Sequence, residues 1–348
     1  MTEAIKPLIS TIIPTYRRPV LLRRAIVSAV EQRGVDVRVC VFDNCSGDET
    51  AEVVSGMAQE HGQIRYHCHA HNIGAGANFD FAMRSIDTPF FSLLSDDDYL
   101  LPGFYQRALA GLAENPEAMF WVGESLWVDE QGTIWDARVD RWSREGLFSP
   151  PEGLMAMMHG RTPTWTGIVF RRELLDRIGF LDQETLGPSD LDFMLRAASQ
   201  PFVLSKSPSA VYMLNTESFS ATQPLSAFWP GWQKMFLNVQ ANEALDEETR
   251  DAVLKALHED AQRMLFRRGA NALVGGRYDF AREAAHTLQD YYRMTGRSWT
   301  LRILASLSES VPFVQKLYAW AYHGWERHLV ASRADLEARY GHLVQRSS

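Results

Sequence analysis

Three adjacent carboxylates, at residues 96–98, follow the apolar stretch 90–94 of the sequence. The apolar stretch predicts a buried strand, so the carboxylates are expected at the carboxyl end of that strand. Neighbouring carboxylates repel one another unless a cation lies close to them. A divalent cation shared with the phosphate oxygens of a substrate would remove this repulsion, and a solvated acidic turn is the alternative.

Two more candidate contact residues, Tyr16 and Asp43, stand at the ends of the apolar runs 8–14 and 37–43. An aromatic ring offers a face for stacking, and a carboxylate accepts a hydrogen bond from the imide N–H of uracil or thymine. Cytosine lacks that proton and would fit poorly. The structural alternatives are that Tyr16 only packs and that Asp43 caps the following helix together with Ser46.

The elements that would position these residues alternate between strands and helices. Strands are predicted at 8–14, 37–43, 64–68, 89–94 and 119–128, with helices after 21, after 46 and over 77–85, 171–178 and 189–198. Such alternation is typical of an α/β fold with a Rossmann-type, mostly parallel sheet flanked by helices. In such sheets, ligands bind at the carboxyl ends of the strands. The polar, turn-rich stretch 137–151 predicts a mobile loop.

After about residue 225 the sequence predicts helices only. The segments 246–266 and 278–292 show helical periodicity and are separated by the breaker Gly275-Gly276. We therefore expect an α/β domain over residues 1–225 and a helical C-terminal appendage over residues 226–348.

Composition limits the class of protein. The chain has 348 residues, 46% of them hydrophobic, and its three cysteines include no CxxC pair, which favours a reducing, cytoplasmic setting without a zinc or disulfide framework. The first ten residues lack the pattern of a signal peptide, and no run of about 18 uncharged apolar residues occurs. A formal net charge of -8 argues against a nucleic-acid partner.

Four segments occur in an order that resembles the family 2 glycosyltransferases with the GT-A fold. They are residues 12–18 (IIPTYRR), 41–44 (VFDN), 72–74 (NIG) and the acidic triplet at 96–98, and the resemblance covers about residues 8–220. It implies an inverting transferase that uses a nucleotide-sugar donor, UDP foremost, with thymidine and guanosine forms open. Bacterial enzymes of this kind build surface polysaccharides or glycolipids, which implies a saccharide or lipid-linked acceptor.

The resemblance also implies a role for each motif residue. The residues implied to contact the nucleotide are Pro14, Thr15, Tyr16, Asp43, Asn72, Asn78, Asp96 and Asp97. Asp98, together with Asp96, is implied to ligate Mn²⁺ or Mg²⁺, which would stabilise the diphosphate as it leaves. Helix capping is an equal explanation for the two asparagines.

A general base is needed because the acceptor hydroxyl must lose its proton as it attacks the anomeric carbon. The segment 187–196 resembles the family's Glu-Asp-x-Asp segment, whose first Asp is that base. This implies Asp190 as the base, with Ser189 in place of the Glu. A position at a helix N-terminus would also suit Asp190 for structural reasons, and Asp192 is the second candidate for the base.

Residues on the acceptor side and one departure from the family pattern complete the predicted site. Trp165, Thr166 and Gly167 are expected beside the acceptor, with a tryptophan in the core as the alternative. Many relatives carry a metal-binding His after the strand at 210–214, whereas this chain has Asn215. An amide oxygen is a weaker, neutral ligand, so Asn215 would hold the metal more loosely.

The C-terminal tail is basic and aromatic. From Lys255 to the end there are 14 Lys and Arg against 9 Asp and Glu. A tail helix over 310–346 would either contact the inner face of the membrane peripherally, near a lipid-linked acceptor, or pack on the main domain or on another subunit of an oligomer.

Two other functions compete with the transferase. A nucleotidyltransferase that forms sugar nucleotides should carry a glycine-rich basic loop after the first strand, where this chain has Arg17-Arg18-Pro19. A non-catalytic nucleotide-sugar-binding protein is the other alternative, because Ser189 and Asn215 depart from the family pattern.

Overall fold

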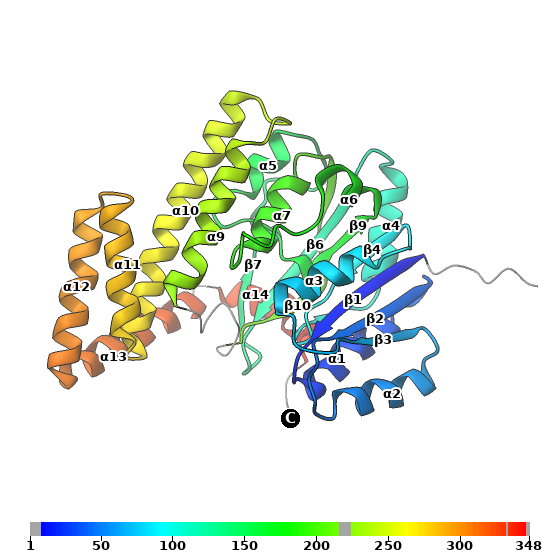
Figure 1. Ribbon diagram of the computed structural model, residues 1–348, viewed down its shortest axis with the longest axis horizontal. Helices are drawn as coiled ribbons and strands as arrows, with labels where there is room; N and C mark the ends of the chain where they lie inside the picture. The colour runs from blue at the N-terminus through cyan, green and yellow to red at the C-terminus, as the bar shows by residue number, and fades with distance from the viewer. Residues whose placement is uncertain (1–7, 216–223, 332, 346–348) are drawn as a thin grey trace, which may run out of the picture.

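A ten-stranded sheet with helices on both faces forms the centre of the molecule (Figure 1). The computed structural model describes residues 8–215, 224–331 and 333–345. Strand order across the sheet is β3-β2-β1-β4-β9-β6-β10-β5, with β7 paired to β6 and β8 paired to β10. The predicted α/β class is confirmed.

The first third of the chain builds the parallel half of the sheet. Its strands are β1 (Ile9–Thr15), β2 (Val37–Asp43), β3 (Ile64–Cys68) and β4 (Phe90–Leu93), and its helices are α1 (Pro19–Val30), α2 (Thr50–Glu60) and α3 (Ala75–Arg84). β2 pairs in parallel with both β1 and β3, and β1 pairs in parallel with β4. The carboxyl ends of these strands therefore lie along one edge of the sheet.

The second part of the chain completes the sheet with mixed pairing. It contains β5 (Tyr99–Leu100), α4 (Phe104–Glu114), β6 (Phe120–Val128), β7 (Ile134–Ala137), β8 (Gly146–Phe148), α5 (Glu152–Met157), β9 (Ile168–Arg171), α6 (Glu173–Ile178), α7 (Ser189–Ala197) and β10 (Phe202–Met213). β9 runs antiparallel to both β4 and β6, and β10 runs parallel to β6. β6 and β10 consequently point in the same direction as β4.

Each face of the sheet carries its own hydrophobic cluster because side chains alternate along a strand. On β1, Ile9 and Ile13 pack against α1, α2 and α4, whereas Ile12 belongs to the cluster beneath α3, α6 and α7. Two buried hydroxyls, of Thr11 and Ser92, each lie 2.6 Å from the Tyr105 hydroxyl of α4, so the polar groups inside the first cluster are paired.

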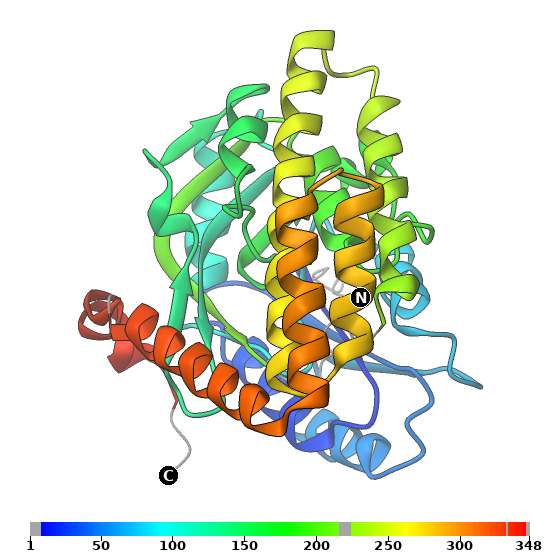
Figure 2. The ribbon, with the colours of Figure 1, turned by 90° about the vertical axis from the view of Figure 1, so that its left-hand side faces the viewer.

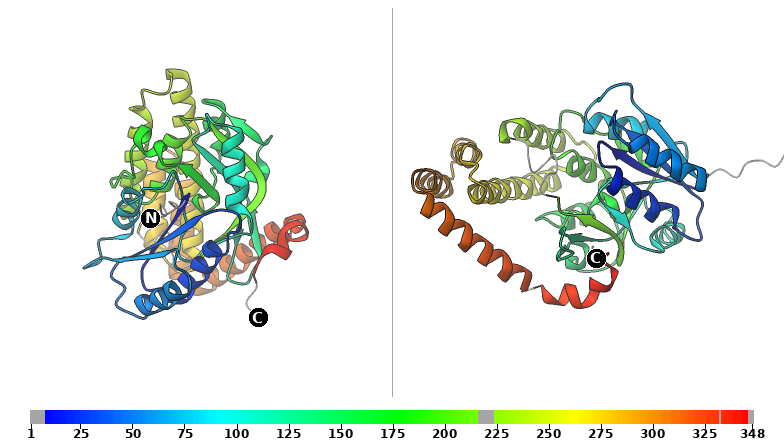
Figure 3. Two further views of the ribbon diagram at one scale, coloured as in Figure 1. Left: turned by 90° about the vertical axis from the view of Figure 1, so that its right-hand side faces the viewer. Right: turned by 90° about the horizontal axis from the view of Figure 1, so that it is seen from below.

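Helices make up the rest of the described chain. They are α9 (Leu225–Gln240), α10 (Glu247–Val274), α11 (Tyr278–Asp290), α12 (Thr295–Ser310), α13 (Pro312–Ala331) and α14 (Ala334–Tyr340). α11 and α12 stand beside α10, and α13 then runs back toward the sheet (Figures 2 and 3). None of the described helices combines the length and apolar composition that crossing a bilayer requires.

The helical region shares its core with the sheet. Met235 of α9 and Leu257 of α10 belong to the same buried cluster as Phe120 of β6. At the other end of the region, Leu336 and Tyr340 of α14 pack in a cluster with Tyr99 and Leu126. The division at residue 225 stays a prediction, and the packing shows that both ends of the helical region are anchored on the α/β part.

The mobile loop predicted over 137–151 was wrong in part. β8 lies inside this stretch and pairs antiparallel with β10 over Phe202↔Phe148, Val203↔Leu147 and Leu204↔Gly146. A strand of three residues is too short to show an alternating pattern, and turn residues stand on both sides of it. Its conformation depends on pairing with a strand that is distant in the sequence.

Candidate functional site

The end of β1 brings Thr15 against the acidic triplet. Thr15 pairs in register with Asp43 of β2, and its Oγ1 donates a 2.8 Å hydrogen bond to Asp96 Oδ2. The triplet follows β4, the other neighbour of β1. We use the name triplet edge for Thr15, Arg18, Asp43 and residues 96–98, which the structure brings together as the parallel pairing predicts.

Arg18 compensates part of the negative charge of the triplet. Its Nη1 lies 3.2 Å from Asp96 Oδ1 and 2.8 Å from Asp97 Oδ2. Arg24 adds a hydrogen bond to the backbone carbonyl of Asp97. The sequence reasoning assigned no role to Arg18, although an arginine three residues beyond the end of β1 is a usable signal, because that end faces the triplet.

Two carboxyl groups of the triplet, those of Asp96 and Asp98, have raised pKa values. Asp96 is 7% exposed, and burial together with the charge of Asp97 raises the pKa of Asp96 to about 6, although Arg18 opposes the shift. Asp98 is 0% exposed. Burial and Asp97 also raise the pKa of Asp98 well above its ordinary value, although the hydrogen bonds it accepts oppose this.

Asp98 connects the triplet edge to two other parts of the fold. Thr166 Oγ1 donates a 2.5 Å hydrogen bond to Asp98 Oδ2, and the backbone N–H of Met213 donates a 2.8 Å bond to Oδ1. Asn215 follows Met213 by two residues and is half-buried, so this end of β10 lies beside the triplet. Thr166 therefore contacts the triplet directly. It was predicted to lie beside the acceptor, and this contact with the triplet was not predicted.

The fit of a divalent cation rests on the state of these carboxylates. Burial, followed by the charge of Asp97, raises the pKa of both Asp96 and Asp98, and a cation at this edge would stabilise the ionised form of the two carboxylates. Within the described residues, no group of three or more His, Cys, Asp and Glu side chains could hold a metal ion. A cation here would therefore need further oxygens from a bound diphosphate or from water.

Asp43 is an acceptor with both oxygens already in use. Its Oδ1 accepts hydrogen bonds from Ser46 N at 2.9 Å and from Ser46 Oγ at 2.6 Å, and its Oδ2 accepts a 2.6 Å bond from the Tyr66 hydroxyl. Burial, followed by the bond to Asp43, raises the pKa of Tyr66. Asp43 thus shapes the turn after β2 and does not cap α2, which begins at Thr50 with Glu49 at its N-cap. A base N–H would have to share the oxygens of Asp43.

Around Asp43, Tyr16 and Asn78 differ in accessibility. The Tyr16 ring is 38% exposed, with the Arg17 guanidinium 5.1 Å from its centre, so one face is available for stacking. Asn78 is buried; its Nδ2 donates to the Phe42 carbonyl at 2.9 Å, and its Oδ1 lies 2.9 Å from His69 Nε2. Asn78 therefore connects the end of β2 to the residue that follows β3, and it does not cap a helix.

Asn72 organises the loop before α3. Its Oδ1 accepts hydrogen bonds from Asn44 Nδ2 at 3.0 Å and from Gly74 N at 2.9 Å. Asn44 Oδ1 in turn accepts from Ile73 N at 2.8 Å. Asn72 is exposed, so this loop presents a polar surface next to the end of β2. Asn44 holds that loop in place, a role the sequence reasoning did not give it.

Asp190 lies in the first turn of α7 and faces a cavity. Its carboxylate is accessible to solvent, and one oxygen accepts a 2.8 Å hydrogen bond from the backbone N–H of Leu191. Protein surrounds the group on most sides, so desolvation raises the pKa of Asp190, opposed by that hydrogen bond and by the charge of Arg138. A carboxylate with a raised pKa is a stronger base than an ordinary aspartate.

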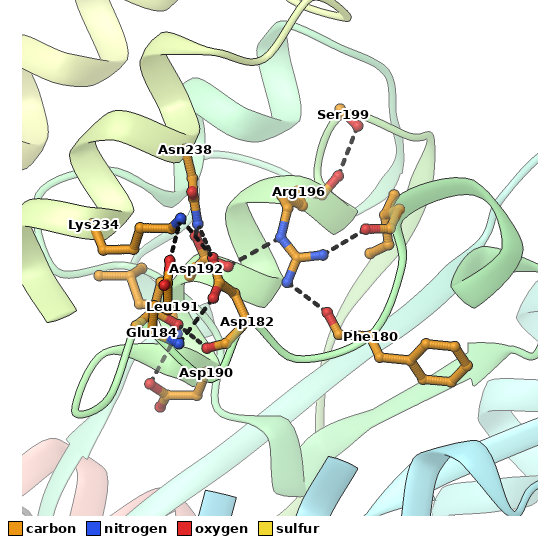
Figure 4. Close-up of polar contacts among 12 residues, drawn as sticks. Phe180, Asp182, Glu184, Asp190, Leu191, Asp192, Arg196, Ser199, Lys234 and Asn238 are labelled. Carbon is orange, nitrogen blue, oxygen red and sulfur yellow. Dashed lines mark hydrogen bonds and ion pairs between the residues drawn. The ribbon is translucent and has the colours of Figure 1, made fainter. Parts of the chain in front are cut away.

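Asp192, the second candidate base, is part of the structural framework of α7. It is 1% exposed, Arg196 Nε donates to its Oδ2 at 3.0 Å, and Asn238 Nδ2 of α9 donates to its Oδ1 at 2.9 Å. Figure 4 shows Asp192, Asp182 and Asn238 gathered together, whereas the Asp190 carboxylate points away from them. The two carboxylates thus lie on different faces of one helix, Asp192 in the protein interior and Asp190 at the surface of the cavity.

The cavity beside Asp190 measures about 600 Å³ and lies between the sheet and α10. Its wall includes Trp127, Trp165 and Tyr212 near the triplet edge. The Trp165 Nε1 donates a 3.3 Å hydrogen bond to the Asp190 carbonyl, and its ring contacts Phe193 edge-on at 5.7 Å. Trp165 is therefore both half-buried and part of the cavity wall. We call this space the Asp190 cavity.

Arg138 is part of the cavity wall, whereas Gly167 lies outside the lining and packs closely against β6. A Cβ at Gly167 would lie 2.4 Å from Ser125 Oγ and 3.0 Å from the Gly123 carbonyl, so the close approach to β6 excludes a side chain there. The Arg138 guanidinium stacks 3.6 Å from the centre of the Trp127 ring. Arg138 was missed because it lies in the stretch predicted as a loop, and nothing in its sequence neighbourhood marks it.

Comparisons of the sequence with known proteins find glycosyltransferases. Residues 10–179 match the family description "Glycosyl transferase family 2". An uncharacterized glycosyltransferase of Rickettsia typhi is 26% identical over 238 residues, which cover 66% of this chain and 72% of that protein. The GalNAc(5)-diNAcBac-PP-undecaprenol beta-1,3-glucosyltransferase of Campylobacter jejuni is 28% identical over 183 residues, covering 51% of this chain and 56% of that protein.

A solved structure has a similar fold. The crystal structure of S. aureus TarS 1-349 in complex with UDP-GlcNAc superposes with a TM-score of 0.61, covers 91% of each chain and shows 14% sequence identity. At this level of identity, the superposition supports the fold, including the helices beyond the sheet.

Proposed function

Because this chain belongs to glycosyltransferase family 2, we propose that it is an inverting enzyme that transfers a sugar from a UDP-sugar to a hydroxyl of a saccharide or glycolipid acceptor. The observation that carries the proposal is the placement of Asp190 on the wall of a cavity that adjoins the triplet edge. Thr166, next to the cavity-wall residue Trp165, donates its hydrogen bond to Asp98 of the triplet, so the two parts of the site are in contact.

The similar proteins support the donor and acceptor classes. The TarS structure is a complex with UDP-GlcNAc, and the Campylobacter protein is named as a glucosyltransferase that acts on a saccharide linked to diphosphate and undecaprenol. In the proposed donor site, Tyr16 would stack on the base and the polar loop of Asn72 would lie beside it. Asp43 would keep the turn in shape while sharing an oxygen with the base.

In the proposed reaction, Asp190 accepts the proton of the acceptor hydroxyl as that oxygen attacks the anomeric carbon. The bond from this carbon to the β-phosphate oxygen breaks on the opposite face, so the product has inverted configuration and UDP leaves with the bonding electron pair. Asp96 and Asp98 would hold Mn²⁺ or Mg²⁺ together with the diphosphate. The ion would supply Lewis-acid stabilisation of the leaving group. Arg18 keeps the carboxylates of the triplet positioned.

The test is calorimetric binding of UDP, GDP and dTDP, each with and without Mn²⁺, followed by release of UDP from UDP-sugars. We expect UDP to bind with a gain from Mn²⁺ and a UDP-sugar to be turned over. Replacing Asp190 by Asn should abolish turnover and leave UDP binding intact. Absence of binding by any of the three nucleotides to folded protein would refute the proposal.

A further inference from the structure

The Asp190 cavity is lined by more positive charge than a neutral acceptor needs. Among its described lining residues, four are arginines, namely Arg138, Arg263, Arg267 and Arg268, and two are carboxylates, Asp190 and Asp260. The last three arginines lie on α10, across the cavity from the sheet. Guanidinium groups bind phosphate oxygens in a planar, two-point geometry, so their convergence favours an oxyanion.

The two carboxylates balance only part of this charge, because four arginines line the cavity. Asp260 is already engaged, since Arg263 Nη2 lies 2.6 Å from its Oδ1 and the backbone N–H of His159 donates to its Oδ2 at 3.0 Å. Asp190 faces the cavity as the proposed base. Arg267 is exposed on the same face of α10 as Arg263, one helical turn later, so the two guanidinium groups are neighbours.

Arg138 is the most constrained of the four. It stacks on Trp127, and its Nη1 donates to the Thr162 carbonyl at 3.3 Å. Its buried Nε forms no hydrogen bond and lies 3.8 Å from Asp136 Oδ2. Burial lowers the pKa of Arg138, because removing the charged guanidinium from water costs free energy. An anion in the cavity would lower that cost, because it would interact with the charged guanidinium at short range.

The same wall carries aromatic rings. Trp127, Trp165 and Trp232 line the cavity together with the arginines. Aromatic faces pack against the apolar faces of sugar rings and against hydrocarbon, whereas guanidinium groups pair with anions. The cavity therefore suits a ligand in which a sugar or lipid portion stands next to a negative charge.

We propose that the acceptor of this enzyme is a phosphate-bearing molecule, and that Arg138 and the arginines of α10 bind its phosphodiester or diphosphate while Asp190 meets its hydroxyl. This inference rests on the proposed function and names the acceptor class of the same site. A phosphate group offers several oxygens to arginines on opposite walls, which a single carboxylate cannot reach together. The phosphate could belong to a lipid-linked saccharide or to a soluble sugar phosphate.

The experiment measures binding to the full chain with the donor site filled by saturating UDP and Mn²⁺. The probes are GlcNAc 1-phosphate, free GlcNAc, glucuronic acid and farnesyl diphosphate, each titrated by calorimetry. We expect the phosphate probes to bind at least tenfold more tightly than GlcNAc and glucuronic acid. Tighter binding of farnesyl diphosphate would indicate a lipid-linked source, and tighter binding of GlcNAc 1-phosphate would indicate a soluble one.

The matched variants are R263Q/R267Q and, as control, K255Q/R177Q. The control removes the same number of charges from exposed positions outside the cavity, one of them on the same helix. We expect R263Q/R267Q to bind the phosphate probes roughly tenfold or more weakly, with unchanged UDP binding and thermal unfolding, and the control to match the wild type.

The outcomes separate the two proposals. If UDP does not bind to the wild type, the transferase proposal fails and the acceptor inference fails with it. If UDP binds but phosphate has no advantage over glucuronic acid, or both double variants bind the phosphate probes as the wild type does, the acceptor inference is overturned while the transferase proposal stands.

Discussion

The triplet edge is assembled from residues 15–98, whereas the Asp190 cavity draws its wall from separate segments between residues 127 and 268. At the triplet edge, parallel strands set Thr15, Asp43 and Asp96 side by side, and polar contacts join most groups at short range. In the cavity, arginines and tryptophans from distant elements converge on one aspartate. Under the proposed function, donor binding depends on the sheet, whereas acceptor choice depends on the packing of helices on it.

The largest expected effect separates catalysis from donor binding. Asp190→Asn removes the proposed base without changing the size of the side chain, so kcat should fall about 10²-fold to 10⁴-fold. UDP affinity should change less than twofold because Asp190 lies in the cavity wall. Rates of sugar transfer and calorimetry with UDP check both parts. A variant that keeps full activity would remove Asp190 from the mechanism.

The pH profile of the wild type refines this prediction. Because desolvation raises the pKa of Asp190, kcat should decline toward acid with an apparent pKa above the ordinary value of an aspartate. The carboxylate must be ionised to accept a proton, so activity rises with pH through this pKa. The acid limb should be absent from the small residual activity of Asp190→Asn.

A change at the triplet edge should produce the opposite pattern. Arg18→Gln removes the positive charge that pairs with Asp96 and Asp97, and the loss of this charge should weaken UDP binding roughly tenfold. Arg23→Gln, at an exposed position of α1 just after Arg18, is the control. Calorimetry with UDP should show a loss for the first variant only. Equal affinities in both variants would show that Arg18 serves folding alone.

The contact between the two regions can be tested through Thr166. Thr166→Val keeps the shape of the side chain but leaves the buried Asp98 without its 2.5 Å hydrogen bond. The free energy of unfolding should drop by about 1–3 kcal/mol, as for other buried groups that lose a partner. Urea titrations measure the drop, and Thr166→Ser should restore most of it, since the hydroxyl is retained.

A further prediction concerns a buried carboxyl group of β6. Glu124 of β6 is 0% exposed, accepts a hydrogen bond from Asp140 N at 2.5 Å and has one oxygen without a partner. Burial raises the pKa of Glu124 from 4.5 to about 8. The folded state therefore holds a proton that the unfolded state releases, and the associated stability is complete below pH 4.5, falls as the pH rises and is lost above about pH 8.

Urea unfolding between pH 5 and 8 checks this. In the wild type, Glu124 should contribute a decrease of up to about 1.4 kcal/mol per pH unit to the free energy of unfolding. Glu124→Gln has no proton to exchange, so its decrease should be smaller. Identical slopes in the two proteins would show that Glu124 is ionised in the folded state.

Several elements could be predicted because their signals are local. β1, β2, β3 and β6 appear within a residue or two of the predicted strands, since each is an apolar run bounded by turn residues. β8 and the return of α14 to the sheet could not be predicted, because a three-residue strand and a short helix depend on partners far away in the chain. The full length of β10 was missed for the same reason, as its pairing with β6 shifts register around Pro208.

By itself, the sequence determined the alternation of strands and helices, the clustering of Thr15, Asp43 and the triplet at one edge of the sheet, and the position of Asp190 at a helix N-terminus. These follow from periodicity and from the rule that parallel strands end together. Tertiary structure alone decided that Ser46 and Tyr66 donate hydrogen bonds to the carboxylate of Asp43. It also decided that Arg18 pairs with the triplet and that arginines of α10 line the same cavity as Asp190. The physical reason is that most of these contacts join residues far apart in the sequence. The distance between such residues depends on how the elements pack, which local sequence patterns do not specify.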